Sequence, residues 1–268
     1  MPKARLWALV LAIAAAPLWA EEPANPLEPS PTWDALRYDV VGDAAIADGA
    51  AIFAVEAPYR AHDAATVPVR IVQTAPDATL HKATVVIDEN PAPVAADLTF
   101  GPALAPLDFE LRVRVNQYSN LRVIADTGAG LAMTGRFVKA SGGCSAPATK
   151  GMTEALAAMG QMRLKTFASD GPQSGTRREA QIMIRHPNYS GLQRDQITQL
   201  FIAPHFIDRL EVRQGDEVLF TMEGGISISE NPVFRFQYTD NGAPSFRVLA
   251  HDTEGMSFAQ DLPKEPAS

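Results

Sequence analysis

The sequence predicts an all-β protein made of two antiparallel β-sandwiches that are joined by a cysteine-bearing arm and a short helix. Apolar and polar residues alternate with a period of two through most of the chain. Gly, Asn and Asp interrupt this alternation at short intervals, which is typical of antiparallel sandwiches. The alternation stops around the only cysteine of the 268-residue sequence and then resumes. We therefore expect one sandwich on each side of that cysteine.

The first 20 residues have the composition of a cleavable secretory signal peptide. Lys3 and Arg5 precede an apolar run over 6–16, and Ala20 supplies a small residue at the expected cleavage site. This run is shorter than the roughly 20 residues that a membrane-spanning helix needs. Residues 21–32 contain four prolines and no hydrophobic periodicity, so we expect a flexible lead-in there.

The chain is acidic, with 23 Lys and Arg against 31 Asp and Glu, a net charge of -8. Removal of Lys3 and Arg5 with the signal peptide leaves 21 basic residues against 31 acidic ones, a net charge of -10. Such a charge repels nucleic acids and anionic lipids. We expect a soluble exported protein with neither as a partner and with no membrane insertion after cleavage.

Residues 33–140 are expected to form the first sandwich. Thr32 is predicted to cap a short helix that contains Trp33 and Leu36, with Asp34 in its first turn. Glycines over 42–49 end that helix. Alternation then predicts strands over 67–72, 83–88, 109–115, 121–125 and 131–138.

Residues 141–160 are expected to form the arm and a connecting helix that begins at Thr153, with Met152, Leu156 and Met159 at helical spacing. Residues 161–262 are expected to form the second sandwich, and residues 263–268 a frayed tail. Its strands are predicted over 162–165, 180–185, 210–212, 218–222, 234–238 and 246–250.

Cys144 is the main candidate for a functional residue. It lies in Ser141-Gly142-Gly143-Cys144-Ser145-Ala146-Pro147, where no bulky side chain shields the sulfur and the glycines allow many backbone paths. A single cysteine cannot form an internal disulfide, and an odd thiol in an exported protein indicates a reactive group or intermolecular pairing. We expect an exposed thiol on a flexible arm that becomes chemically loaded.

Three basic residues near Cys144 in the sequence, Arg136, Lys139 and Lys150, are expected to favour its thiolate form. Two simpler interpretations stay open. In the first, Cys144 is an incidental residue of a linker. In the second, it forms a disulfide-linked homodimer when the protein is isolated.

The sequence predicts no metal site and no cofactor. His186 is interpreted as a strand-end residue because no second histidine or carboxylate lies at ligand spacing, and the other histidines are scattered. The methionines at 152, 159 and 162 suggest packing more than a copper site. No dinucleotide-binding fingerprint and no nucleophile–base pair can be identified.

The order of the motifs resembles the SoxYZ sulfur-carrier family of bacterial sulfur oxidation. More closely, it resembles the fused SoxYZ-like carriers that are associated with quinoprotein dehydrogenases. The first half is similar to SoxY over residues 58–69 and at Gly142-Gly143-Cys144. The second half is similar to SoxZ at His186-Pro187 followed by Gly191, and over residues 204–207 and 225–232.

This resemblance implies two immunoglobulin-like sandwiches packed into one body and a carrier that is not itself an enzyme. Cys144 would hold a sulfur-containing intermediate covalently, with Gly142 and Gly143 as the hinge of its arm. Periplasmic partners would be enzymes of sulfur oxidation or a quinoprotein dehydrogenase with cytochrome c. The chain departs from the family because its arm is internal, and Pro147 stiffens the far side.

Two other function classes remain open. A periplasmic copper or small-ligand binding module would take up metal even after Cys144→Ser. A structural adaptor for a dehydrogenase would keep its function after Cys144→Ala and lose it on surface changes.

Overall fold

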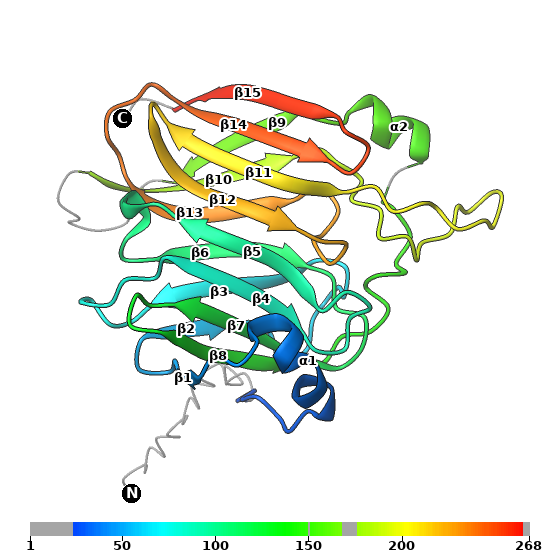
Figure 1. The fold of residues 1–268 in the computed structure, drawn as a ribbon. Coiled ribbons are helices and arrows are strands. Elements are labelled where there is room, and N and C mark those ends of the chain that lie inside the picture. The colour runs from blue at the N-terminus through cyan, green and yellow to red at the C-terminus, as the bar shows by residue number, and fades with distance from the viewer. Residues whose placement is uncertain (1–23, 150, 168–175, 265–268) are drawn as a thin grey trace, which may run out of the picture.

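The computed structural model describes residues 24–149, 151–167 and 176–264. The signal peptide predicted for residues 1–20 and most of the predicted tail lie outside these ranges. The described strands form a nine-stranded sheet and a six-stranded sheet that face each other (Figure 1). No helix in these ranges combines the length and apolar composition needed to cross a membrane.

The elements follow the chain in two groups, one on each side of Cys144. The first group is α1 (Pro31–Val41), β1 (Ile46–Asp48), β2 (Phe53–Glu56), β3 (Val67–Gln73), β4 (Lys82–Ile87), β5 (Val94–Phe100), the short 3-10 helix η1 (Pro102–Leu104), β6 (Asp108–Val113), β7 (Ser119–Asp126) and β8 (Leu131–Val138). The second is α2 (Met152–Ala157), β9 (Met162–Phe167), β10 (Arg177–Ile184), β11 (Ile207–Gln214), β12 (Glu217–Gly224), β13 (Val233–Thr239), β14 (Ser245–Asp252) and β15 (Ser257–Pro263). The predicted all-β fold of two immunoglobulin-like sandwiches is confirmed.

Both sheets continue from the first half of the chain into the second. The larger sheet has the order β1-β8-β7-β4-β5-β12-β11-β14-β15, and the smaller one β2-β3-β6-β13-β10-β9. The halves meet where β5 pairs with β12 and β6 pairs with β13, both antiparallel. Backbone hydrogen bonds therefore join the two sandwiches edge to edge in both layers, as the ribbon shows (Figure 1).

An aromatic cluster fills the core at this junction. Phe109 of β6 packs edge-on against Phe220 of β12, with ring centroids 5.0 Å apart, and is stacked 6.4 Å from Phe236 of β13. All three side chains are at most 1% exposed. These residues belong to one buried cluster that spans both halves, so the halves share one hydrophobic core, and burial of each such ring contributes about 1.5–3 kcal/mol.

The first helix begins two residues earlier than the sequence predicted. Ser30, and not Thr32, is its N-cap, because the Ser30 hydroxyl accepts the backbone N–H of Trp33 at 3.1 Å. Pro31 then occupies the first helical position, where its missing N–H and fixed φ are tolerated. Gly42 ends the helix with a φ of 60°.

Hydrogen bonds tie the described part of the lead-in to the first sandwich, whereas the sequence predicted a flexible segment. The Asn25 side-chain amide donates to the carbonyls of Ala57 and Phe137 at 2.9 and 3.1 Å. The backbone N–H of Glu28 donates to the Asn120 side chain at 2.8 Å. These bonds hold residues 24–32 along the edge of the first sandwich.

The connecting helix α2 is present, but it begins after Gly151 and not at Thr153. Met152 and Leu156, which were expected to pack, are 41% and 43% exposed. Four strands, β1, β2, β5 and β15, have no counterpart among the expected ones. The first two have only 3 and 4 residues, and the other two contain Ala and Asp, which have weak strand preference.

Candidate functional site

Cys144 lies in a turn that follows β8, at the junction of the two halves. The backbone N–H groups of Gly142 and Gly143 donate to the carbonyls of Asn116 and Val115 at 2.8 and 3.0 Å. These acceptors lie just beyond β6, so the arm runs beside the end of that strand. Gly142 has a φ of 77°, a left-handed conformation that favours glycine.

The expectation of an exposed thiol is wrong for this structure. The Cys144 residue is 0% exposed, although Ser141 and Ser145 on either side of it are exposed. Gly143 explains the close packing, because a Cβ at that position would come within 2.0 Å of the Ala64 carbonyl oxygen. Glycine is therefore required here for a close backbone approach, and Gly143 is packed in this conformation.

A segment of the second half covers the arm. We call residues 186–206, which connect β10 to β11, the capping segment; its outer part projects from the body on the right of Figure 1. The buried Ser190 hydroxyl donates to the Cys144 carbonyl, and the buried Gln193 amide donates to the Ala146 carbonyl at 2.9 Å. The arm is therefore held by hydrogen bonds from both halves.

The far end of the arm is also fixed. The backbone N–H and the hydroxyl of Thr149 both donate to the Glu230 carboxylate. Between this end and the capping segment lies a groove of about 520 Å³, lined by residues that include Met152, Tyr189 and Ile197. Ile197 is 92% exposed. The groove gives this side of the arm open space.

A buried arginine lies beside the thiol. Arg114 is 1% exposed, and its Nη1 and Nη2 atoms donate to the carbonyls of Gly143 at 3.1 Å and Asn188 at 3.3 Å. Its Nε atom is buried without a hydrogen-bond partner. Within the described residues Arg114 forms no ion pair, and both of its hydrogen-bond acceptors are carbonyl oxygens.

Burial and this guanidinium act in opposite directions on the thiol. Burial raises the pKa of Cys144 to about 11, and the positive charge of Arg114 lowers that pKa by a smaller amount. Burial in turn lowers the pKa of Arg114. In this closed conformation Cys144 is a neutral thiol at pH 7, which is a poor nucleophile.

Two of the basic residues expected to favour the Cys144 thiolate have other partners. The Lys139 ammonium sits over the Tyr59 ring, 4.6 Å from its centroid, and Arg136 donates to the carbonyl of Gly135. Lys150 lies outside the described residues. Arg114 was missed because the alternation over 109–115 places it on the polar side of a strand. No signal within the sequence of that strand indicates that the other half covers this position.

The segment with the longest SoxZ-like motif packs against the same place. The Arg114 backbone N–H donates to the Ser227 carbonyl at 2.7 Å, and the Asn90 side chain donates to the Arg114 carbonyl at 2.7 Å. Asn188 donates to the Ser229 carbonyl at 3.1 Å. The motif therefore builds a buried polar layer that positions Arg114 and the capping segment.

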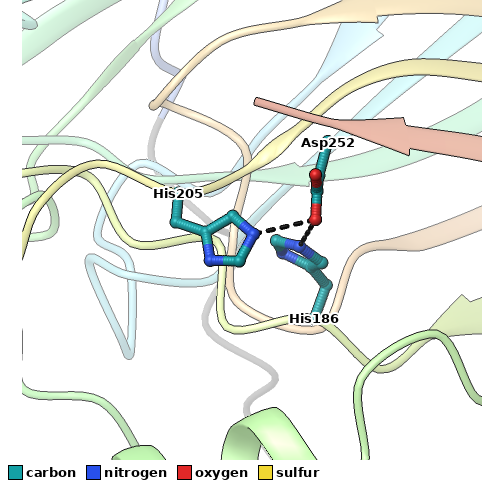
Figure 2. Close-up of side chains that lie close together, drawn as sticks. All are labelled: His186, His205 and Asp252. Atoms are coloured by element: carbon teal, nitrogen blue, oxygen red, sulfur yellow. Dashed lines mark hydrogen bonds and ion pairs between the residues drawn. The ribbon is translucent and has the colours of Figure 1, made fainter. Parts of the chain in front are cut away.

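A second buried polar cluster holds the base of the capping segment (Figure 2). His186 and His205 point their Nε2 atoms at one oxygen of Asp252, at 3.4 and 2.8 Å. Their ligand atoms all lie within 4.8 Å of one another, close enough for a metal ion. No second histidine or carboxylate lies at ligand spacing from His186 in the sequence, but folding brings His205 and Asp252 beside it.

The hydrogen bonds of this cluster favour a structural role over metal binding. The His186 Nδ1 atom accepts the backbone N–H of Asn188 at 3.1 Å, so a neutral ring carries its proton on Nε2. That Nε2 proton then points at Asp252, and no lone pair remains on the His186 ring for a metal. The other Asp252 oxygen accepts the backbone N–H groups of Glu254 and Met256 at 3.0 and 2.8 Å.

Comparison with known proteins places two families along the chain. The family described as sulfur oxidation protein SoxY matches residues 37–144, and the family described as sulphur oxidation protein SoxZ matches residues 166–263. The SoxY match ends at Cys144 itself. A search of curated proteins finds no match.

Among solved structures, the sulfur carrier protein SoxY from Chlorobium limicola f thiosulfatophilum is 27% identical in sequence. The match covers 40% of this chain and 94% of that one, with a TM-score of 0.34. The assignment does not rest on this likeness. Because a SoxY domain and a SoxZ domain follow each other and together cover most of its length, this chain belongs to the SoxYZ type of sulfur-oxidation proteins.

Proposed function

We propose that the protein is a periplasmic sulfur carrier that holds a sulfur-containing group covalently on Cys144 and turns over no substrate itself. The observation that carries this proposal is the position of the thiol. Cys144 is the last residue of the SoxY match, and the SoxZ match follows within the same chain. Its partners are sulfur-oxidation enzymes, or a quinoprotein dehydrogenase system with cytochrome c.

Loading requires the arm to leave its closed position. A thiol with a pKa of about 11 is ionised in only about one molecule in ten thousand at pH 7. Exposure to water removes the burial that raises this pKa, so the thiolate becomes available as the arm opens. The closed conformation thus stores an unreactive thiol.

Opening has to break hydrogen bonds that hold the arm in place. The capping segment releases the hydrogen bonds from Ser190 to Cys144 and from Gln193 to Ala146, and Arg114 releases the carbonyl of Gly143. Net contributions of such bonds are about 0.5–1.5 kcal/mol each. Gly142 and Gly143 then act as the hinge, since both tolerate the backbone angles that an outward swing needs.

The covalent step is an exchange of sulfur–sulfur bonds. The Cys144 thiolate attacks the outer sulfur of a sulfane donor R–S–SH, one S–S bond forms and the donor S–S bond breaks. R–S⁻ leaves with the electron pair, and the proton of the original thiol goes to water. No separate oxidant or reductant is consumed, and the reverse exchange delivers the cargo to a partner.

Intact-protein mass spectrometry of material from the periplasm tests this proposal. We expect a fraction of the wild-type protein to carry extra sulfur atoms that a reducing agent removes, and none in Cys144→Ser. A periplasmic protein that is never modified at Cys144, together with full function of Cys144→Ala in the cell, would favour the structural adaptor.

A further inference from the structure

Arg114 has hydrogen-bonding capacity and charge that the closed structure does not use. A guanidinium offers five N–H donors, and two of its three nitrogens here bind the carbonyls of Gly143 and Asn188. The third nitrogen, Nε, is buried and has no partner. A buried cation in this state is destabilising unless an anion accompanies it.

The position of the guanidinium links it to the thiol. One of its hydrogen bonds ends on the residue directly before Cys144, and the other ends on the capping segment that covers Cys144. Within the described residues no carboxylate forms an ion pair with the guanidinium, and Cys144 itself is a neutral thiol at pH 7 in this conformation. A negative group attached to the Cys144 sulfur would therefore bring a counter-charge next to Arg114.

We propose that Arg114 is a specificity-determining residue that selects negatively charged sulfur groups as the cargo of Cys144. This inference rests on the proposed carrier function. A group that ends in an anionic oxygen or sulfur receives charge-assisted hydrogen bonds from the guanidinium, which are stronger than neutral ones. A neutral or cationic group leaves Arg114 without a counter-ion and is held less firmly.

Two thiol reagents of similar size and opposite charge test this selectivity. Sulfonatoethyl methanethiosulfonate leaves an anionic group on the sulfur, and trimethylammonioethyl methanethiosulfonate leaves a cationic one. In both, the thiolate attacks the sulfenyl sulfur, the bond from that sulfur to the sulfonyl group breaks, and methanesulfinate leaves with the electron pair. The thiol proton goes to water, so no further reactant is needed.

The modification rate is measured by intact mass, and each rate is divided by that of the urea-unfolded protein to remove intrinsic reactivity. We expect the ratio of anionic to cationic rates to fall about tenfold from wild type to Arg114→Gln, because one ion pair of about 1.4 kcal/mol is lost. Arg114→Lys keeps most of the preference. Arg112→Gln, two residues earlier in the chain, is the matched control and keeps all of it.

Melting temperatures of the two wild-type adducts provide a second measurement that needs no variant. The anionic adduct should melt at the higher temperature, with a difference that shrinks in high salt. Equal melting temperatures, or equal rate ratios in wild type and Arg114→Gln, would overturn the role of Arg114 and leave the carrier proposal standing. A Cys144 that reacts with neither reagent while folded would count against both.

Discussion

Two arginines of the SoxY half are buried to a similar degree but are compensated in different ways. Arg122 is 4% exposed, binds Asp88 through Nε at 2.8 Å and Nη2 at 2.9 Å, and lies over the Trp33 ring, 4.7 Å from its centroid. Arg114 is 1% exposed and has only carbonyls as partners. The fold therefore gives the structural arginine, Arg122, a carboxylate counter-ion. Arg114, beside the thiol, has none.

The same contrast separates the two buried clusters around the capping segment. The carboxylate of Asp252 accepts hydrogen bonds from two histidine rings and two backbone N–H groups, so its charge and lone pairs are satisfied. Asn188 connects this cluster to Arg114, since its N–H binds His186 and its carbonyl binds the guanidinium. A satisfied cluster anchors the segment, and an unsatisfied one faces Cys144.

The largest expected effect comes from breaking the compensated pair. Asp88→Ala leaves Arg122 buried without its counter-ion, and we expect a loss of about 3–5 kcal/mol in the free energy of unfolding, measured with urea. The control is Glu56→Ala, which removes an exposed partner of Arg70 and should cost less than about 1 kcal/mol. Equal losses in the two variants would show that burial of Arg122 does not govern the energetics.

The next effect is a dependence of stability on pH that belongs to Cys144. Its pKa is about 11 in the folded protein, above the ordinary value of 9.0, so the unfolded chain releases the proton first. The stabilisation is complete below pH 9 and is lost as the pH rises to 11. At about 1.36 kcal/mol per unit, the loss amounts to about 2–3 kcal/mol.

This loss is measured as the difference between wild type and Cys144→Ser in urea unfolding at several alkaline pH values. The subtraction is needed because other groups titrate there, including Tyr238, whose pKa is raised by burial to about 12. If the two proteins lose stability in parallel, the thiol is not buried in solution, and the closed arm is not the dominant conformation.

Most of the strands could be predicted from sequence, whereas the state of the thiol could not. Alternation over 67–72 and 109–113 indicates which side chains face the core, and the buried residues of β3 and β6 alternate accordingly. Glycines beside Cys144 are compatible both with a free arm and with close backbone packing. The close approach of the Ala64 carbonyl to Gly143 shows that the arm is packed, and this contact joins residues far apart in the sequence.

The residues around the thiol could not be predicted either, because they too are brought together by long-range contacts. The local alternation places Arg114 on the polar side of a strand, but its guanidinium contacts Asn188, which lies far along the chain. His186, His205 and Asp252 likewise come from separate segments. A local sequence pattern predicts which face of a strand is polar. It does not predict which distant segments will cover that face in the folded protein.

A smaller change is expected when the unpaired cation itself is removed. Arg114→Met loses two hydrogen bonds but also removes a desolvated charge, so we expect the free energy of unfolding to change by only about 1 kcal/mol. The pKa of Cys144 should rise further, because Arg114 is the group that lowers it. Alkylation rates as a function of pH measure that rise. A loss as large as that of Asp88→Ala would place Arg114 among the structural arginines.

The smallest effect is expected from added metal. In a Cys144→Ser background, where the thiol cannot bind, Zn²⁺ or Cu²⁺ should leave the melting temperature unchanged, because the His186 Nε2 proton occupies the position that a metal would need. A bound metal would have to displace that proton and break the bond to Asn188. A stoichiometric rise in melting temperature that disappears in His205→Ala would contradict this assignment. It would also give the compensated cluster a ligand-binding role, and the contrast with Arg114 would then no longer separate structure from function.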